Sequence, residues 1–443
     1  MIQSTHAPTH ATVSRRLCAL AGWLLGGLAL ACAQLPAGTP LDSLYRHLHR
    51  HPELSFHEAA TAALLAAELR SLGYEVHEGI GGYGIVGVLR NGEGPVLMVR
   101  TDTDALPVVE ETGLPYASRV QVADGTGRSV GVMHACGHDM HMSVWVGTAR
   151  DLAARRRDWR GTLLMVAQPA EERGSGAQAM LADGLYERFP RPDYALALHA
   201  HATLPTGTVG LCPGYAMANV DMLDIRVRGR GGHGAYPHTT LDPVVLAARI
   251  VLTLQTIVSR EISPLAPAVV TVGSIHGGSK GNVIPDEVKL ELTLRSYDDA
   301  VHAALIEKTR RICTGEALAA GVPDSLYPEV VVRDEHCPSL YNDPDLTAQL
   351  EAVLRTRLGT EAVRMVAPVM AGEDFSRYGR TPERVPVMLF WLGTADPDRA
   401  AAAARGEISL PSLHSAQFAP VIQPTLDTGV HAMIAAALHL LAR

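Results

Sequence analysis

Apolar residues along this chain follow two alternating patterns, which predict strands interleaved with helices. Short apolar runs over residues 95–99, 163–167, 194–198 and 386–391 are typical of buried strands. Residues 57–72 instead place Leu64, Leu65, Leu69 and Leu72 at helical spacing, and Gly73 is positioned to end that helix. This alternation predicts an α/β domain built on a mostly parallel sheet.

The middle of the chain shows a different order of elements. Residues 221–337 contain a strand, a helix, two strands, a helix and a strand, at 222–227, 243–258, 269–275, 288–296, 300–319 and 329–333. This βαββαβ order is that of a ferredoxin-like unit. A helix at 344–358 then returns to the first pattern. We therefore expect residues 221–337 to be an inserted domain within a catalytic domain formed by residues 40–220 and 338–443.

Polar residues follow several of the predicted buried strands. Asp102 and Asp104, then Glu171 and Glu172, and finally His199 come just after apolar runs. Open α/β sheets bind ligands at the carboxyl ends of their parallel strands. The pattern therefore predicts a functional site at this edge of the sheet.

Composition and charge narrow the class of protein. With 443 residues the chain is too long for one compact core, and 47% apolar and 19% charged residues are ordinary for a folded globular protein. The formal charge of −8 and the lack of a basic stripe with interleaved aromatic residues disfavour nucleic acid as a partner.

The first residues have the features of a secretory signal peptide, which we place at residues 1–33. Arg15 and Arg16 precede an apolar stretch at 17–31, and small residues follow where a signal peptidase cleaves. The stretch is too short for a stable membrane span, so we expect export to a bacterial periplasm. The arginine pair leaves twin-arginine export open as an alternative to the general pathway. Cys32 raises the alternative of a lipid anchor, which Ala29 disfavours because a Leu is expected there.

The densest group of reactive side chains is the run MHACGHDMH at residues 133–141. Cys and His ligands suit divalent Zn, Ni, Co or Mn. Adjacent Glu171 and Glu172 point in different directions, so one can bind metal while the other transfers a proton. We expect Cys136 to stay free as a metal ligand, and Cys212, Cys313 and Cys337 to be ordinary buried thiols.

A series of motifs resembles the metal-dependent amidohydrolases of the aminoacylase, hippurate hydrolase and auxin-conjugate hydrolase kind. The motifs occur in order: HRHPELS (49–55), RTDTDALP (100–107), MHACGHDMH (133–141), QPAEE (168–172), GHGAYPH (232–238), GNVIP (281–285), GEDF (372–375) and LHS (413–415). The resemblance covers nearly all of the chain after the signal segment. It implies a zinc-peptidase-like catalytic domain whose inserted domain serves as a lid and dimerisation unit.

The resemblance also implies a role for individual residues. The ligands of two divalent metal ions would be Cys136, His138, Glu172, His199 and His414. Glu171 would be the general base, His233 would stabilise the oxyanion from the partner subunit of a homodimer, and Asn282 would line the substrate pocket. Two positions depart from relatives. Arg100 stands where related carboxypeptidases have a metal-binding His, and Ala416 replaces a common Pro.

These observations predict an enzyme that hydrolyses the amide bond of N-acyl-amino acids. A metallo-dipeptidase or carboxypeptidase with the same centre is an alternative, as is a catalytically silent relative that only binds carboxylates. A structural zinc knot around Cys136 and His138 is a further alternative, but it requires a closed set of four ligands and leaves Glu171 and Glu172 unexplained.

Overall fold

A computed structural model describes residues 35–123 and 127–442. The predicted signal segment, residues 1–33 with Cys32, lies outside the described residues. The strands predicted from buried apolar runs are all present as β3 (Val96–Asp102), β6 (Gly161–Gln168), β7 (Tyr194–Pro205) and β18 (Val387–Ala395).

These four strands form the centre of an eight-stranded sheet with the order β1-β2-β6-β3-β7-β18-β8-β17. The strands β6, β3, β7 and β18 run parallel to one another. The outer strands are β1 (Glu75–Ile80), β2 (Gly84–Asn91), β8 (Val209–Leu211) and β17 (Val363–Met365). Antiparallel pairing occurs only toward the edges of this sheet, between β1 and β2, β2 and β6, and β18 and β8. The prediction of an α/β domain with a mostly parallel sheet is confirmed.

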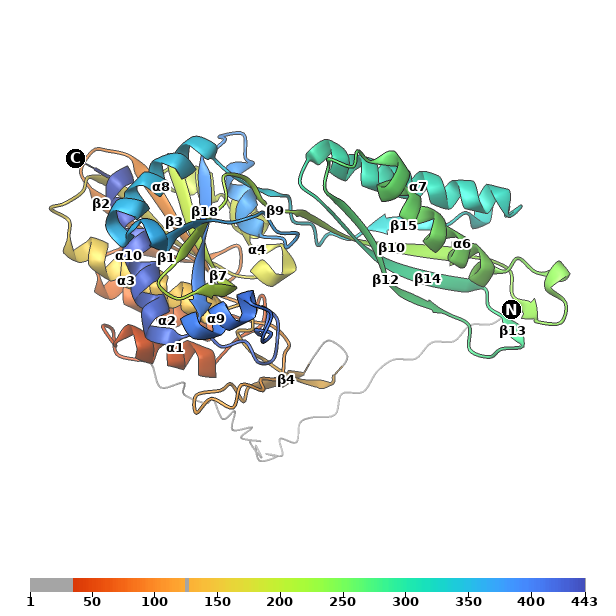
Figure 1. Cartoon of the computed structure of the whole chain (residues 1–443), viewed down its shortest axis with the longest axis horizontal. Helices are drawn as coiled ribbons and strands as arrows, with labels where there is room; N and C mark the ends of the chain where they lie inside the picture. The colour runs from red at the N-terminus through yellow and green to blue at the C-terminus, as the bar shows by residue number, and fades with distance from the viewer. Residues whose placement is uncertain (1–34, 124–126, 443) are drawn as a thin grey trace, which may run out of the picture. The chain divides into compact units, whose positions relative to one another are not determined.

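Helices cover both faces of this sheet, as the labelled helices around β3, β7 and β18 illustrate (Figure 1). One apolar core holds α1 (Leu41–Arg50), α2 (Ala59–Ser71), α3 (His138–Ala154), α8 (Pro344–Leu358) and α10 (Ile422–Leu440) against the sheet. The other core contains α4 (Gly176–Ala182), α5 (Leu185–Arg188) and the short helix η6 (Asp374–Gly379). Because both faces are covered, the central strands are largely apolar before their carboxyl ends, and β18 has no exposed residue.

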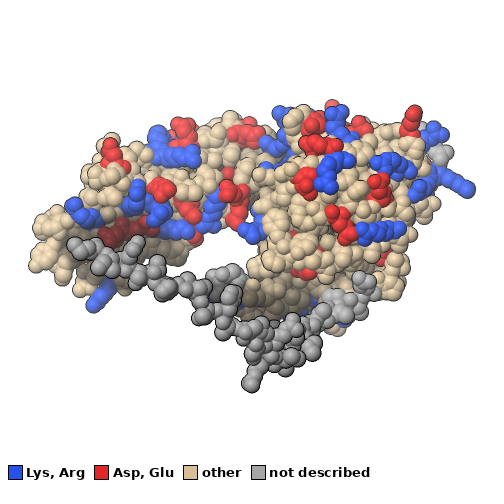
Figure 2. Space-filling view, turned by 180° about the vertical axis from the view of Figure 1, so that it is seen from behind, with Lys and Arg blue, Asp and Glu red and all other residues tan. Residues whose placement is uncertain are grey.

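Shorter elements connect these layers. They are β4 (Gln121–Ala123) with β5 (Ser129–Gly131), β9 (Gly214–Met217) with β16 (Leu340–Asn342), and α9 (Pro397–Ala404). On the face shown in Figure 2, Lys and Arg side chains are interspersed with Asp and Glu.

Residues 219–332 form a second sheet with the order β12-β14-β10-β15, antiparallel throughout. Its elements are β10 (Asn219–Arg228), α6 (Pro243–Thr256), β12 (Ala268–Gly277), β14 (Glu287–Ser296), α7 (Asp299–Ala319) and β15 (Glu329–Val332). Figure 1 shows α6 and α7 lying over this sheet. Asp242 and Asp298 begin the two helices, because each carboxylate accepts hydrogen bonds from backbone N–H groups of the first turn.

In β10 and β14 buried residues alternate with less buried ones, so the two faces of the second sheet differ in burial. Leu223, Ile225, Leu290 and Leu292 are buried against the helices. The residues between them face away from the helices and are less buried. A two-stranded ribbon of β11 (Gly232–His233) and β13 (Val283–Ile284) extends from this unit.

One helical segment among the described residues, Pro243–Glu261, is apolar and long enough to cross a membrane. It comprises α6 and the following turn η3 (Ile257–Glu261). Leu246, Ile250 and Leu254 of this segment pack in the core of the second sheet. Membrane insertion would therefore require removing α6 from that core.

Candidate metal centre

The ligand residues predicted from the sequence converge at the edge of the large sheet. The Cys136 Sγ atom lies 3.5 Å from His199 Nε2 and 3.2 Å from His414 Nε2. His414 Nε2 is in turn 3.5 Å from Glu172 Oε2. His138 Nε2 lies 3.8 Å from Glu172 Oε1 and 3.9 Å from Glu171 Oε2. Thus five residues that span almost 280 positions of the sequence bring their side chains together at one site.

Cys136 and His138 are positioned by the start of α3. Gly137 between them has a φ of 84°, which lets the chain turn into the helix. The His138 Nδ1–H donates to the backbone oxygen of Asp104 at 2.8 Å, which leaves Nε2 facing the centre. A backbone partner for one ring nitrogen is a common way to orient a metal-binding imidazole.

His199 lies within β7 and not after its end, which differs from the expectation. The strand continues to Pro205 because it pairs with β18 over its outer half. Its pairing with β3 ends at Leu196, however, so β7 is open on that side from there on. The site lies beside the part of β7 that follows Leu196, where β7 no longer pairs with β3.

The backbone around two site residues is strained. His414 has a φ of 64° and Ala170, which precedes Glu171, has a φ of 51°. Non-glycine residues seldom adopt this conformation, and it persists only where surrounding contacts impose it. The Ala170 N–H donates to Glu58 Oε1 at 2.9 Å. The N–H groups of Glu171 and Glu172 both donate to the Asp104 carboxylate.

Negative charge is in excess at the centre. Arg100 is the only buried Lys or Arg among the described residues, and it contacts Asp102, Glu373 and Asp374 at 2.6–3.1 Å. Burial and the Glu373 carboxylate raise the pKa of Glu171 well above its usual value. Burial also raises the pKa of Glu172 to about 7.

The same excess of negative charge changes the pKa values of the His138 imidazole and the Cys136 thiol. Burial alone would lower the pKa of His138, but the carboxylates of Asp102, Glu172 and Asp104 raise it to about 10. Burial, with Glu172 and Glu171, raises the pKa of the Cys136 thiol well above its usual value. Added positive charge would favour the ionised Cys136 thiolate and Glu172 carboxylate and the neutral His138 imidazole, which are the states that bind metal.

The donor atoms fit a divalent cation. His138 Nε2 and Glu172 Oε1 are buried and have no hydrogen-bond partner. Cys136, His138 and His199 place one ligand atom each within 4.8 Å of one another, and so do Cys136, Glu172 and His414. Thiolate, imidazole and carboxylate together form a borderline-soft donor set that suits Zn, Ni, Co or Mn.

Behind the donors lies a layer of hydrogen-bonded residues whose contacts were not predicted from the sequence. The Asp102 Oδ1 atom accepts a hydrogen bond of 2.7 Å from His141 Nδ1, whose Nε2 accepts one from the Ala200 N–H. Gln168 links Arg100 to Asp374. The RTDTDALP and GEDF motifs contain most of these residues, but their sequence does not reveal that they lie side by side.

His233 and Asn282 are not near this centre. They lie on the ribbon of β11 and β13, where the Gly234 N–H donates to the Asn282 backbone oxygen. Both side chains are exposed, and neither lines the cavity of about 720 Å³ at Cys136. Their predicted roles in catalysis stay predictions.

Comparisons with known proteins place this geometry among metal-dependent hydrolases. Residues 98–416 match the model of Peptidase family M20/M25/M40. The chain is 36% identical over 359 residues to an N-acetyl-L-cysteine deacetylase of Bacillus subtilis, covering 80% of both proteins. It is 36% identical over 339 residues to a hippurate hydrolase of Campylobacter jejuni, covering 75% of this chain and 83% of that protein.

A solved structure has the same fold. It is a Bacillus subtilis protein described as a dinuclear metal-binding peptidase of the M20 family, with 29% identity and a TM-score of 0.71. The match covers 90% of this chain and 97% of that chain.

We expect Gly137→Ala to weaken cation binding. A Cβ atom there would lie 3.0 Å from Ala200 Cβ and 3.3 Å from the Phe418 ring, and the positive φ itself costs about 1–2 kcal/mol with a side chain. Cys136 and His138 would shift on either side of it. Calorimetric titration with Zn²⁺ or Mn²⁺ measures the effect.

Gly315→Ala in α7 is the matched control, because nothing lies within 4 Å of its Cβ position. It should bind cations normally and be more stable by about 0.4–1 kcal/mol. Equal cation affinity in the two variants would contradict the assignment of Gly137.

Proposed function

The chain belongs to Peptidase family M20/M25/M40 and is a metal-dependent amidohydrolase, and from this premise we propose that it cleaves N-acyl-amino acids at a centre of two divalent cations. The observation that carries the proposal is the convergence of Cys136, His138, Glu172, His199 and His414 beside Glu171. The deacetylase and the hippurate hydrolase named above act on substrates of this class.

The ligand set contains two groups that share Cys136. His138 and His199 form one group with the thiol, and Glu172 and His414 form the other. Two cations so bound would supply Lewis acidity, which activates water and polarises the amide carbonyl.

Glu171 is placed to transfer protons. Its side chain is buried beside the ligands but is not needed to complete either group that contains Cys136. In the reaction its carboxylate accepts the proton of the attacking water and then donates it to the nitrogen of the leaving amino acid. Burial raises the pKa of Glu171, which makes its carboxylate a stronger base than an exposed one and suits it to accept that proton.

The cavity offers a partner for the carboxylate of the substrate. Arg295 on β14 lines it, and its Nε–H donates to Thr293 Oγ1 at 3.1 Å. Arg295 is half-buried and forms no ion pair with any described residue. Its hydrogen-bond partners among the described residues are neutral oxygens, those of Thr293 and of the Met370 backbone. A guanidinium without a carboxylate partner that lines a cavity favours an anionic substrate group, since burying its charge unpaired costs free energy.

We propose that residues 219–332 are a ferredoxin-like lid through which two chains form a homodimer. The sheet order β12-β14-β10-β15 supports the ferredoxin-like assignment. Two features of the surface support the dimer. The strand β12 has a free edge, and α6 exposes Val245 and Leu252, whose exposed fractions are 58% and 72%. Dimerisation would bring His233 of one chain to the centre of its partner.

The remaining proposals concern where the protein is located and which class of partner it binds. The pattern of residues 1–33 supports export to a bacterial periplasm, with a lipid anchor at Cys32 less favoured. The net charge of −8 supports a small-molecule substrate over nucleic acid.

The proposed substrate class is tested with a panel on metal-replete protein. We expect turnover of N-acetyl- and N-benzoyl-amino acids, and much slower turnover of the same compounds with the carboxylate converted to an amide. Free dipeptides should be poor substrates. Faster hydrolysis of dipeptides than of their N-acetylated forms would favour a dipeptidase, and stoichiometric binding without turnover would favour a silent binding protein.

The role of Glu171 is tested by Glu171→Gln. We expect kcat to fall by about 10²–10⁴, because the variant lacks the proton acceptor but keeps the shape of the site. Metal content, measured by mass spectrometry of the purified protein, should be unchanged. Glu172→Gln is the matched comparison and should lose cation as well as activity, and the opposite pattern would exchange the two assignments.

The dimer is tested by mixing two inactive variants. His233→Ala should lower kcat by about 10²–10³, the usual effect of removing an oxyanion donor. If His233 acts in the partner's centre, a mixture of His233→Ala with Glu171→Gln regains activity, because each heterodimer has one intact site. No recovery, or a single-chain mass in sedimentation, would refute this arrangement.

A further inference from the structure

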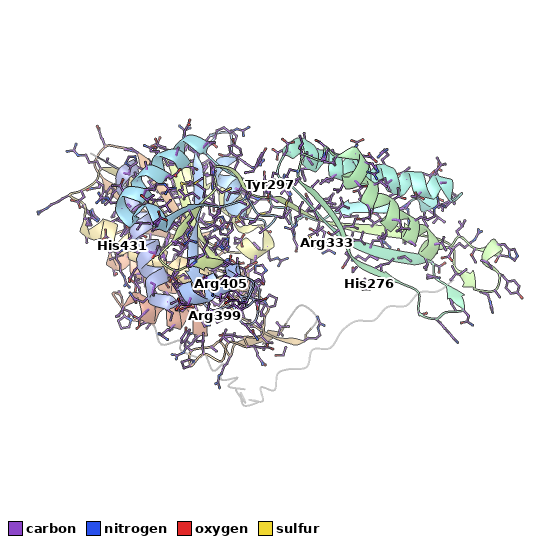
Figure 3. The ribbon with its side chains drawn as sticks, in the orientation of Figure 1. His276, Tyr297, Arg333, Arg399, Arg405 and His431 are labelled. Carbon is purple, nitrogen blue, oxygen red and sulfur yellow. The ribbon has the colours of Figure 1, made fainter. Side chains whose placement is uncertain are left out.

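A second cluster of metal-binding residues lies away from the catalytic centre. It consists of Asp221 on β10, His302 on α7 and His336 after β15. Figure 3 labels Tyr297 and Arg333, which precede His302 and His336 in the sequence. The proposed function uses none of the three.

The three side chains converge closely. Asp221 Oδ2 lies 2.8 Å from His302 Nε2, and Asp221 Oδ1 lies 3.0 Å from His336 Nδ1. The two imidazole rings are stacked, with centroids 5.1 Å apart and planes inclined by 16°. Ligands bound to one ion at about 2.0–2.2 Å lie roughly 3 Å from each other, so these separations suit a shared cation.

An unsatisfied contact distinguishes this cluster from an ordinary ion pair. Asp221 Oδ2 and His302 Nε2 are both buried, and despite their short separation neither makes a hydrogen bond of ordinary geometry. A buried carboxylate oxygen normally has a hydrogen-bond partner. Here the oxygen and the nitrogen lie close enough to each other, and to His336, to bind a common ion.

Access and charge also suit a cation. The Asp221 side chain is 3% exposed, whereas those of His302 and His336 are 22% and 30% exposed, so an ion can enter from the imidazole side. Close contact with the two imidazoles outweighs burial and holds the pKa of Asp221 at about 2, so the carboxylate is ionised. Arg380 is also near His302, but it is paired with Asp299.

One existing contact would have to be given up. The His336 Nδ1 atom lies 3.3 Å from the backbone oxygen of Val220, a long contact to exchange for a metal bond. His302 Nε2 has no such competitor among the described residues.

We propose that Asp221, His302 and His336 bind a divalent cation, with zinc the expected ion, at the point where the chain enters and leaves residues 219–332. Two imidazoles and one carboxylate are ligands that zinc accepts, with the remaining positions open to water. Val220 and Cys337 form a backbone bridge beside the cluster. The ion would therefore tie both connecting segments to α7 and stiffen the hinge between the two sheets.

The site is tested on the full chain by counting bound metal. We expect wild-type protein to bind one more Zn²⁺ per chain than the double variant His302→Gln/His336→Gln. His276→Gln is the matched control, because His276 is an exposed residue of β12 in the same unit (Figure 3). Equal zinc content in the wild type and the double variant would overturn the proposal.

A second measurement does not require the hinge variant to fold. In Cys136→Ala/His138→Gln the catalytic centre loses its shared thiolate and an imidazole. Titration with Co²⁺ should still fill one site per chain, with visible absorption but no thiolate charge-transfer band. A variant that binds no Co²⁺ would overturn the hinge site. Because amide hydrolysis is measured separately on wild-type protein, failure of the hinge site and failure of the proposed function are distinguishable.

Discussion

The catalytic half of this molecule depends on a surplus of buried negative charge. Asp102, Glu373 and Asp374 are fully buried around one guanidinium, that of Arg100. Asp104 is also fully buried, and its carboxylate accepts hydrogen bonds from the backbone N–H groups of Glu171 and Glu172. Burying ionised carboxylates without compensation is costly, so the free energy of the folded state depends on what neutralises them. Protonation can do so, as the raised pKa of Glu171 indicates, and so can cations held by Cys136 and the three imidazoles.

The charged residues gather where the pairing between two central strands of the large sheet ends. The strands β3 and β7 pair only through Leu196, and beyond it β7 continues beside β18 alone. His199 stands on the open side, while α3 begins with His138 directly across from it, with the two rings 6.1 Å apart. The left-handed residues Gly137, Ala170 and His414 let three separate loops turn into this gap. Strain at Ala170 and His414, which are not glycines, accompanies convergence of the donors, as is common at functional sites.

The second sheet contributes a positively charged side chain to the cavity beside the metal-binding residues. Its uncovered face places Arg295 in the catalytic cavity, and its ribbon holds His233 and Asn282 at exposed positions away from that cavity. The connecting segments carry Asp221 and His336 at the joint itself. The geometry of the joint therefore bears on substrate binding, and a cation there would restrict it. Val245 and Leu252 of α6 are exposed on the surface of this unit.

The sequence by itself determined the elements and the donor set. Period-two and helical patterns are local, so the four central strands, α2, and the βαββαβ order could be predicted, as could the ligand motifs with their residues in order. Only the tertiary structure decided which polar residues share a volume. It brought Arg100 to Asp374 across 274 positions, extended β7 past His199, and joined Asp221 to His302 and His336. Such contacts depend on strand order and on where pairing stops, which are properties of the whole sheet that no short stretch of residues encodes.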